Sequence, residues 1–144
     1  MSMKVRALMT EHPATCTPET SLRDAARLML EHDCGAIPVV QSQDSGKVAG
    51  VITDRDITIR AVAEGKNPLE LRVADVMTPQ VFTVTPETDA EECFRLMEEK
   101  QVRRVVVVEE GGRIRGIVAQ ADIARQAPPR KTAEVIRDIS QPAA

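Results

Sequence analysis

Thr53 and Asp56 are the side chains of this sequence best suited to hold a ligand. They follow a short apolar run that begins at Gly50, and an apolar-periodic segment comes after them. This order predicts a buried strand that leads directly into a helix. The first turn of a helix presents free N–H groups and the positive end of the helix dipole, which favour an anion such as phosphate. The Thr53 hydroxyl would add a donor, and the Asp56 carboxylate could accept hydrogen bonds from the hydroxyls of a ribose.

The same two residues also fit a purely structural role. Thr-x-x-Asp ahead of an apolar run is a capping box, in which each side chain accepts a hydrogen bond from the backbone N–H of the other residue. Taken alone, residues 53–56 favour this cap over a nucleotide site. The balance changes because the sequence contains nearly the same pattern twice.

The second copy of the pattern is part of a longer internal repeat. Gly50 and Asp56 recur as Gly116 and Asp122, 66 residues later, because a loop around residues 42–45 makes the first copy longer by two. Ahead of this loop, the matching segments lie 68 residues apart: Met-Thr at 9–10 and 77–78, Thr-Pro-Glu-Thr at 17–20 and 85–88, and Arg-Leu-Met at 27–29 and 95–97.

Each copy is predicted to fold as strand–helix–strand–strand–helix. Capping boxes, Ser21 with Asp24 and Thr88 with Glu91, mark the start of the first helix in each copy. The expected strands are 15–17, 36–40 and 47–53 in the first copy and 82–84, 104–109 and 114–119 in the second, where a tight turn at 110–112 joins the last two. The expected helices are 21–32 and 54–63, the latter ended by Gly65, and then 88–100 and 121–126, the latter ended by Pro128 and Pro129. An extra helix at 132–139 and a frayed end at 141–144 follow.

These elements predict an α/β (α+β) fold of two tandem β-α-β-β-α repeats packed with pseudo-two-fold symmetry. One copy has too little sheet and helix to close a core alone, and face-to-face packing would bring the two strand-to-helix turns into one cleft, a natural place for a ligand. We divide the chain into repeat 1 (1–65), a linker (66–72), repeat 2 (73–128) and a C-terminal extension with a short helix (129–144).

The composition is that of an ordinary globular protein, with 42% hydrophobic and 28% charged residues. A net charge of -3 with scattered Lys and Arg gives no support for a nucleic-acid or membrane partner. No apolar stretch is long enough to span a bilayer and the N-terminal residues do not resemble a signal peptide, so we expect a cytoplasmic protein.

The metal-binding and redox side chains are few. Cys16, Cys34 and Cys93 lie far apart, so we expect buried or half-buried thiols rather than a disulfide or a zinc site. His12 and His32 have no third ligand at metal spacing and are expected to be bystanders. With only two aromatic residues, both Phe, the core must be aliphatic, and a stacking surface for single-stranded nucleic acid is disfavoured.

The paired copies resemble the cystathionine-β-synthase (CBS) domain pair, also called a Bateman module. The resemblance rests on the repeated Met-Thr and Thr-Pro-Glu-Thr segments and on Gly-Val-Ile-Thr-Asp-Arg-Asp-Ile at 50–57, and it covers roughly residues 5 to 128. It implies a regulatory module that binds AMP, ADP, ATP or S-adenosylmethionine between the repeats. It also implies that Thr53 contacts phosphate and that Asp56 holds the ribose hydroxyls.

The second copy departs from the family motif. Asp122 is in place, but Ala119 stands where the motif has Thr or Ser. A hydrogen bond to a charged group contributes roughly 1.5–3 kcal/mol, so the second site should be about ten- to a hundred-fold weaker. In the alternative interpretation, Asp122 contacts no ligand and its carboxylate only stabilises the positive end of its helix dipole.

The resemblance also implies contacts to the base and the phosphates, around the first short strand and the start of the second strand of each copy. Arg55 and Arg104 are the candidates for phosphate, although an isolated surface Arg needs no ligand to explain it. The remaining candidates are Thr17, Ala36, Ile37, Pro38, Val81 and Val105.

Two functions compete from the sequence. The first is a non-catalytic sensor that needs no cofactor, binds an adenine nucleotide or S-adenosylmethionine, and signals to an unidentified protein partner. The second is a dimerisation platform with an empty cleft, in which the helix at 132–139 forms an interface. An enzyme such as a phosphotransferase is a distant third, because Gly111-Gly112 does not match a phosphate-binding loop. The resemblance further implies a homodimer, arranged as a flat disc of four repeats.

Overall fold

The computed structural model describes residues 3–141 and divides them into two compact units. Within the described range, unit 1 is built from residues 3–12, 82–110 and 115–141, and unit 2 from residues 13–81 and 111–114. Each unit therefore contains the body of one sequence copy together with a short segment that precedes the body of the other. A mixed α/β fold with two repeats is confirmed, and both repeats share the order helix, strand, strand, helix.

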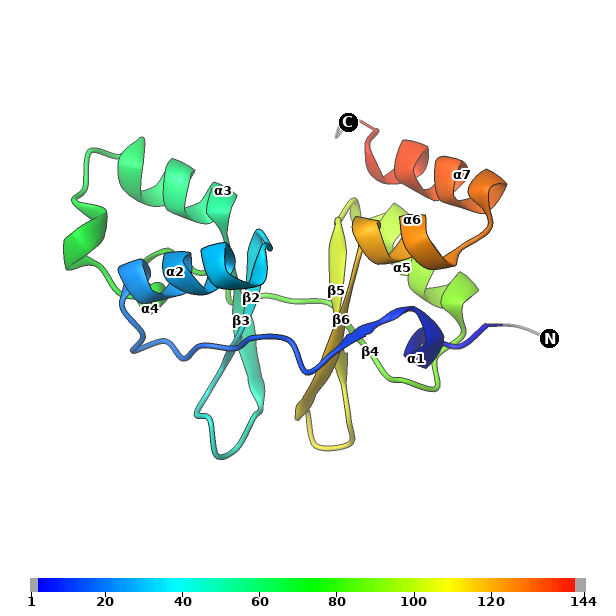
Figure 1. Ribbon diagram of the computed structural model, residues 1–144, viewed down its shortest axis with the longest axis horizontal. Helices are drawn as coiled ribbons and strands as arrows, with labels where there is room; N and C mark the ends of the chain where they lie inside the picture. The colour runs from blue at the N-terminus through cyan, green and yellow to red at the C-terminus, as the bar shows by residue number, and fades with distance from the viewer. Residues whose placement is uncertain (1–2, 142–144) are drawn as a thin grey trace. The chain divides into compact units, whose positions relative to one another are not determined.

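Unit 1 contains a four-stranded sheet with the order β1-β6-β5-β4. β1, from the N-terminal segment, pairs antiparallel with β6, and β4 pairs parallel with β5. Figure 1 shows the N-terminal segment beside the second sequence copy. The elements of unit 1 are α1 (Val5–Leu8), β1 (Thr10–Glu11), β4 (Thr83–Val84), α5 (Ala90–Lys100), β5 (Arg104–Val108), β6 (Ile114–Ala119), α6 (Gln120–Gln126) and α7 (Pro129–Ile139).

Unit 2 contains a two-stranded antiparallel sheet of β2 and β3, with its helices packed against it (Figure 1). The helix that follows β3 begins as an α-helix and continues as a π-helix, and Gly65 follows it with φ +75°. The elements of unit 2 are α2 (Leu22–His32), β2 (Ala36–Val40), β3 (Val48–Thr53), α3 (Asp54–Ile57), the π-helix η1 (Thr58–Val62), the 3₁₀-helix η2 (Pro68–Glu70) and α4 (Val73–Val76).

Each unit buries its own apolar core, because the helices place residues at three- and four-residue spacing on one side. In unit 2, α2 turns Leu22, Ala25 and Met29 inward against β2 and β3. In unit 1, α5 turns Cys93, Phe94 and Met97 into the core. Among residues 3–141, no helix combines the length and the apolar character that crossing a membrane requires.

The strand expected at residues 15–17 is reduced to one bridge, between Cys16 and Val39. Its counterpart in the second copy is a true strand, in which the N–H of Val106 donates to the carbonyl of Phe82 (3.1 Å). Pro38 occupies the position of Val106 and has no N–H to donate. The first copy therefore loses one hydrogen bond of the ladder and with it the strand.

The capping box expected at Thr88 and Glu91 is wrong by one residue. α5 begins at Ala90, with Asp89 at the N-cap position. The hydroxyl of Thr88 instead accepts a hydrogen bond from the N–H of Thr85 (3.1 Å), within the turn formed by Thr-Pro-Glu-Thr. The N-cap at Ser21, by contrast, is confirmed, since its hydroxyl accepts from the N–H of Asp24 (3.0 Å).

The three cysteines differ in burial more than expected. Cys16 and Cys93 are buried, and burial raises the pKa of their thiols to about 11 and about 12. Cys34 is exposed, which corrects the expectation of a buried or half-buried thiol, because it lies just past the end of α2, where no apolar side is turned inward.

The other differences from the sequence-based prediction concern the C-terminal helix and a few short elements. The extra helix begins at Pro129, three residues before the expected start. The short elements α1, β1 and α4 were not predicted. The expected frayed end at 141–144 lies, apart from Gln141, outside the described residues.

Candidate functional site

The strand-to-helix turn of unit 2 forms the capping box that the sequence allows. The N–H of Asp56 donates to Thr53 Oγ1 (3.0 Å), and the N–H of Thr53 donates to Asp56 Oδ2 (3.0 Å). The cap uses one acceptor position of the hydroxyl and one carboxylate oxygen. A hydroxyl also carries a proton to donate, and a carboxylate has a second oxygen. Capping and ligand binding are therefore compatible at this turn.

The second carboxylate oxygen of Asp56 is held only by long contacts. Thr78 Oγ1 lies 3.4 Å from Asp56 Oδ1, and Arg60 Nε lies 3.9 Å from it. The Asp56 side chain retains 13% of its exposure. At these distances neither contact is a strong hydrogen bond. Asp56 Oδ1 is thus available to a stronger donor such as a sugar hydroxyl.

Thr78 reaches Asp56 because its segment pairs with β3. Val51 and Thr78 exchange two backbone hydrogen bonds, each of 2.9 Å. The preceding residue, Gly50, allows this approach, since a Cβ there would lie 2.5 Å from the carbonyl oxygen of Thr78 and 2.5 Å from Cε of Met77. The glycine of the repeated motif therefore holds the Met-Thr segment against the capping turn.

Replacing Gly50 by alanine is expected to lower the free energy of unfolding by about 2 kcal/mol, the usual cost of forcing an extra methyl into a packed contact. Gly116→Ala should behave alike in unit 1, where a Cβ would lie 2.7 Å from the carbonyl oxygen of Thr10. Urea denaturation followed by circular dichroism measures both. An unchanged midpoint for Gly50→Ala would show that the close approach is not required.

The corresponding carboxylate in unit 1, that of Asp122, already has short contacts to both of its oxygens. Asp122 Oδ2 accepts from the N–H of Ala119 (2.8 Å), while Oδ1 accepts from Thr10 Oγ1 (2.8 Å) and from the guanidinium of Arg125 (2.7 Å). Asp122 is 4% exposed. Both oxygens are engaged by short contacts, so a sugar hydroxyl would have to displace one of these partners.

Arg125 in unit 1 and Arg60 in unit 2 explain much of the difference between the two carboxylates. In unit 1, Arg125 lies three residues after Asp122 and turns back to its carboxylate. In unit 2, the corresponding position is Ile59, and Arg60 donates instead to the carbonyls of Val76 (3.1 Å) and Met77 (3.0 Å). Arg60 thereby fastens the Met-Thr segment and leaves Asp56 less occupied.

The remaining predicted residues fall into two groups. Arg55 is exposed, and Thr17 is half-buried with its hydroxyl 3.3 Å from that of Thr20. Ile37 and Val105 are each 1% exposed, so their side chains belong to the cores and only their backbone can face a ligand. Thr17, Ala36, Ile37, Pro38, Thr53, Arg55, Asp56 and Val81 lie in unit 2, whereas Arg104, Val105 and Asp122 lie in unit 1.

Two residues beside the carboxylates were missed at the sequence level. Thr10 and Thr78 each place a hydroxyl on the aspartate that follows the other copy's strand. The signal was present in the Met-Thr segments that recur 68 residues apart. Their contacts were not foreseeable from local sequence, because each segment joins the unit formed mainly by the other copy.

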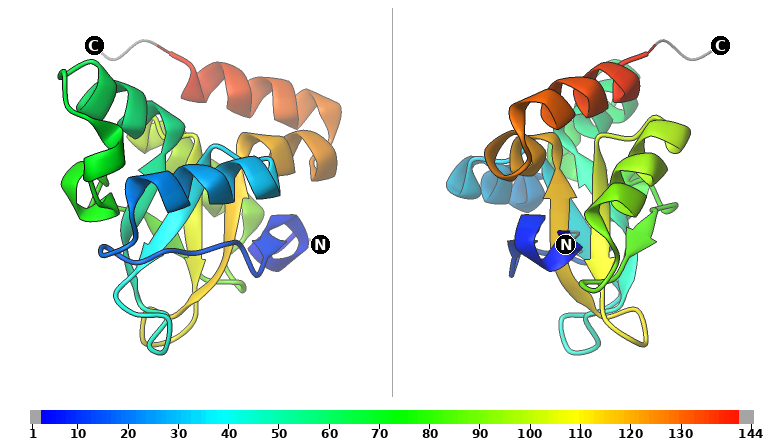
Figure 2. Two further views of the ribbon diagram at one scale, coloured as in Figure 1. Left: turned by 60° about the vertical axis from the view of Figure 1, so that its left-hand side comes forward. Right: turned by 90° about the vertical axis from the view of Figure 1, so that its right-hand side faces the viewer.

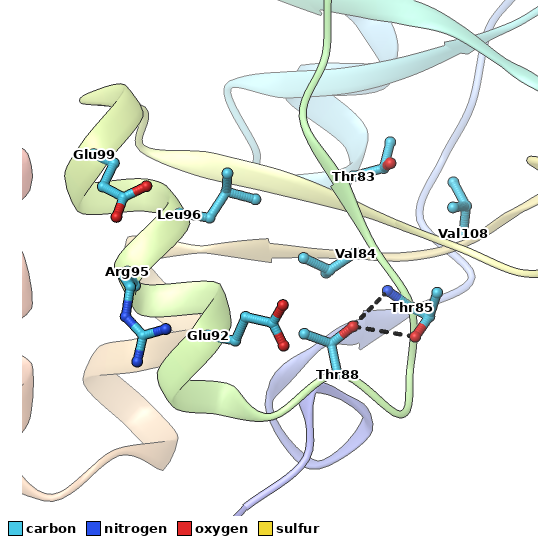
Figure 3. A pocket seen from close by; sticks show the side chains of 9 residues that line it. All are labelled: Thr83, Val84, Thr85, Thr88, Glu92, Arg95, Leu96, Glu99 and Val108. Carbon is cyan, nitrogen blue, oxygen red and sulfur yellow. Dashed lines mark hydrogen bonds between the residues drawn. The ribbon is translucent and has the colours of Figure 1, made fainter.

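A hollow of about 570 Å³ lies elsewhere in unit 1 (Figure 3). Its lining includes three threonines and the charged side chains of Glu92, Arg95 and Glu99, together with three apolar side chains. In unit 2 the position of Thr83 is taken by Thr15, whose hydroxyl donates to Oε1 of Gln43 (3.0 Å). Gln43 belongs to the loop that is longer in the first copy. The lining residues are Thr83, Val84, Thr85, Thr88, Glu92, Arg95, Leu96, Glu99 and Val108.

The repeated strand-to-helix turns, each with an aspartate that reaches back to its strand, match a known family. The sequence profile of the CBS domain matches residues 5–62 and again residues 73–128. The chain belongs to the CBS domain family. Hypoxic response protein 1 of Mycobacterium tuberculosis is 37% identical over 131 residues, which is 90% of each protein. The CBS domain-containing protein YhcV of Bacillus subtilis is 37% identical over 120 residues, 83% of this chain and 82% of YhcV.

Solved structures of CBS domain proteins share the fold. The CBS domain pair of protein MJ0100, solved in complex with 5-methylthioadenosine and S-adenosyl-L-methionine, has a TM-score of 0.76 at 27% identity and covers 87% of this chain and 95% of that one. Hypoxic response protein I, solved with two coordinated zinc ions, has a TM-score of 0.75 at 35% identity, covering 88% and 100%. In this chain, residues 3–141 contain no group of three or more His, Cys, Asp or Glu side chains that could hold a metal ion.

Proposed function

We propose that this CBS domain protein is a regulatory module that binds one adenosyl ligand per chain at Thr53 and Asp56. The observation that carries the proposal is the difference between the two aspartates. Asp56 Oδ1 has only long contacts of 3.4 and 3.9 Å, whereas Asp122 Oδ1 has two short ones of 2.8 and 2.7 Å. Asp56 would accept from the ribose hydroxyls, and Asp122 would remain part of the fold.

An adenine nucleotide, AMP, ADP or ATP, is the ligand that Thr53 favours. Its hydroxyl accepts from the N–H of Asp56 and still has a proton to donate to a phosphate oxygen. Arg55, exposed in the next turn, would add a positive charge beside the phosphate. S-adenosylmethionine is the second candidate, supported by the ligands of the MJ0100 domain pair, which carry adenosine without phosphate.

Calorimetric titration with AMP, ADP, ATP, S-adenosylmethionine and 5-methylthioadenosine tests the proposal. We expect Asp56→Asn, which keeps the size of the side chain and an oxygen for the cap, to weaken binding of the preferred ligand by about ten- to a hundred-fold. Asp54→Asn is the matched control, since it removes the same charge from an exposed neighbour in the same turn. Equal affinities of the two variants, or no binding by the wild-type chain, would overturn the proposal.

Thr53→Val separates the two ligand classes. Loss of the hydroxyl should weaken AMP, ADP and ATP by about tenfold and leave 5-methylthioadenosine unaffected, because only the nucleotides carry phosphate. If all ligands weaken alike, the hydroxyl acts through the cap and not on phosphate.

The ligand would act by changing how a partner protein recognises the module. Ligand binding at Asp56 competes with the contacts from Thr78 and Arg60. Thr78 belongs to the Met-Thr segment, and Arg60 also donates to the carbonyls of Val76 and Met77. A homodimer is the assembly we expect, and a hexameric CBS-CP12 protein among the structural relatives is consistent with oligomerisation of this fold. Sedimentation with and without ligand would measure both the assembly and its response.

A further inference from the structure

β4 forms an open edge of the sheet in unit 1. It is the outer strand in the order β1-β6-β5-β4, and α5 packs against its neighbour β5 (Figures 1 and 2). The N–H of Val106 donates to the carbonyl of Phe82, so the carbonyl of Phe82 faces β5. Successive carbonyls of an extended strand point to opposite sides, and the carbonyl of Thr83 therefore faces the open edge.

The hollow described above lies beside this edge, between β4 and α5. Its volume of about 570 Å³ falls within the range of about 300–1,000 Å³ that small-molecule sites occupy. Within residues 3–141, the hydroxyl of Thr83 has no hydrogen-bond partner. The hollow thus combines the apolar side chains of Val84, Leu96 and Val108 with a hydroxyl and a carbonyl that can each form a hydrogen bond.

The internal repeat shows what kind of group fits beside Thr83. Its counterpart in unit 2, Thr15, is contacted through both of its polar groups by the carboxamide of Gln43. The Thr15 hydroxyl donates to Gln43 Oε1 (3.0 Å), and Gln43 Nε2 donates to the Thr15 carbonyl (3.5 Å). A carboxamide can make both contacts because it carries an acceptor oxygen beside an NH₂ donor.

No side chain of the second sequence copy corresponds to Gln43. The loop after β5 is two residues shorter than the loop after β2, and Gly111 and Gly112 stand in it with φ of +87° and +84°. A tight turn with positive φ favours glycine, which has no side chain to offer. The hydroxyl and the carbonyl of Thr83 therefore remain for a carboxamide that the chain itself does not supply.

The charges around the hollow favour a zwitterion. α5 contributes Glu92, Arg95 and Glu99, and none of the three forms an ion pair in the part of the chain that the structure describes. Figure 3 shows Arg95 and Glu99 on α5, across the hollow from Thr83. Residues four apart on a helix are neighbours on its surface. A guanidinium and a carboxylate side by side suit the adjacent carboxylate and ammonium of a free α-amino acid.

We infer that the hollow between β4 and α5 binds a free amino acid with a side-chain carboxamide, of the class of glutamine and asparagine. Its carboxamide takes the position at Thr83 that Gln43 takes at Thr15. Its carboxylate lies at Arg95 and its ammonium at Glu99. The methylene groups between the two ends contact the apolar part of the lining. This site goes beyond the proposed function and needs no adenosyl ligand.

NMR titration of the isotope-labelled full chain with L-glutamine tests the inference, because it measures both the affinity and the location of binding. We expect saturable shifts that are largest for the amides of residues 83–85 and 92–99. L-glutamate should bind about tenfold more weakly, since a carboxylate has no donor for the carbonyl of Thr83. N-acetyl-L-glutamine, which lacks the ammonium, should also bind about tenfold more weakly.

Two matched pairs of variants locate the contacts. Thr83→Val removes the hydroxyl but keeps the branched shape, and it should weaken glutamine about fivefold. Thr15→Val makes the same change where Gln43 already occupies the hydroxyl, and it should leave the affinity unchanged. Glu99→Gln should weaken glutamine about fivefold, whereas Glu31→Gln, at the corresponding position of α2, should have no effect.

The outcomes separate the alternatives. No saturable shift with glutamine, or equal affinities for glutamine and glutamate, would overturn the inference. Shifts concentrated at residues 53–56 would assign glutamine to the other site and would equally overturn it. If acetyl-trialanine amide binds more tightly than glutamine, β4 takes a peptide strand and the inference is wrong. The lining belongs to unit 1 and residues 53–56 belong to unit 2, so failure here is distinguishable from failure of the proposed function.

Discussion

Replacing Asp122 by alanine is expected to lower the free energy of unfolding by about 3 kcal/mol. The substitution removes the acceptor for the N–H of Ala119 and for the hydroxyl of Thr10, in a residue that is 4% exposed. Losing a helix cap costs about 1 kcal/mol, and losing a hydrogen bond to a charged group, here the one from Thr10, costs about 1.5–3 kcal/mol. The ion pair with Arg125 adds little, because that side chain is 62% exposed and can return to water.

Asp56→Ala provides the matched comparison for this prediction. Asp56 caps its helix in the same way but has weaker additional contacts, so we expect a loss of about 1 kcal/mol. Urea denaturation of both variants, followed by circular dichroism, gives the two values. Equal losses would contradict the distinction between a closed, structural Asp122 and an open Asp56.

The regular elements of this protein could be predicted from the sequence because their signals are local. Alternating apolar residues and capping residues mark α2, β3 and β5 within a few positions of where they lie. The repeat supplied the fold class, since two matched copies must share their order of elements. The short α1, α4 and β1 were missed because two to four residues show no period.

The candidate site was predictable only in part, for reasons of chain connection. Thr53 and Asp56 form one local motif, and their capping box follows from it. The hydroxyls of Thr10 and Thr78 come from segments 112 and 22 residues away from the aspartates they contact, and no local pattern places them. The closure of Asp122 by Arg125 was within reach, because residues three apart on a helix are neighbours.

Replacing Val135 by aspartate is expected to release α7 from unit 1. Val135 is 0% exposed in the core, and burying a carboxylate there without a partner would cost several kcal/mol. The chain can avoid this cost by undocking α7, so the measured loss should be limited to the free energy of docking, about 3 kcal/mol for two apolar side chains returned to water. The sheet of unit 1 should remain folded.

Hydrogen exchange distinguishes this local release from general unfolding. In Val135→Asp, the amides of α7 should lose their protection while those of β5 and β6 keep it, because regions of a structure open independently when few contacts join them. Ala133→Asp is the control, since it places the same charge on an exposed position of the same helix and should change stability by less than about 0.5 kcal/mol. If β5 and β6 lose protection together with α7, the helix is an integral part of the fold of unit 1 and not a cover that can be removed from it.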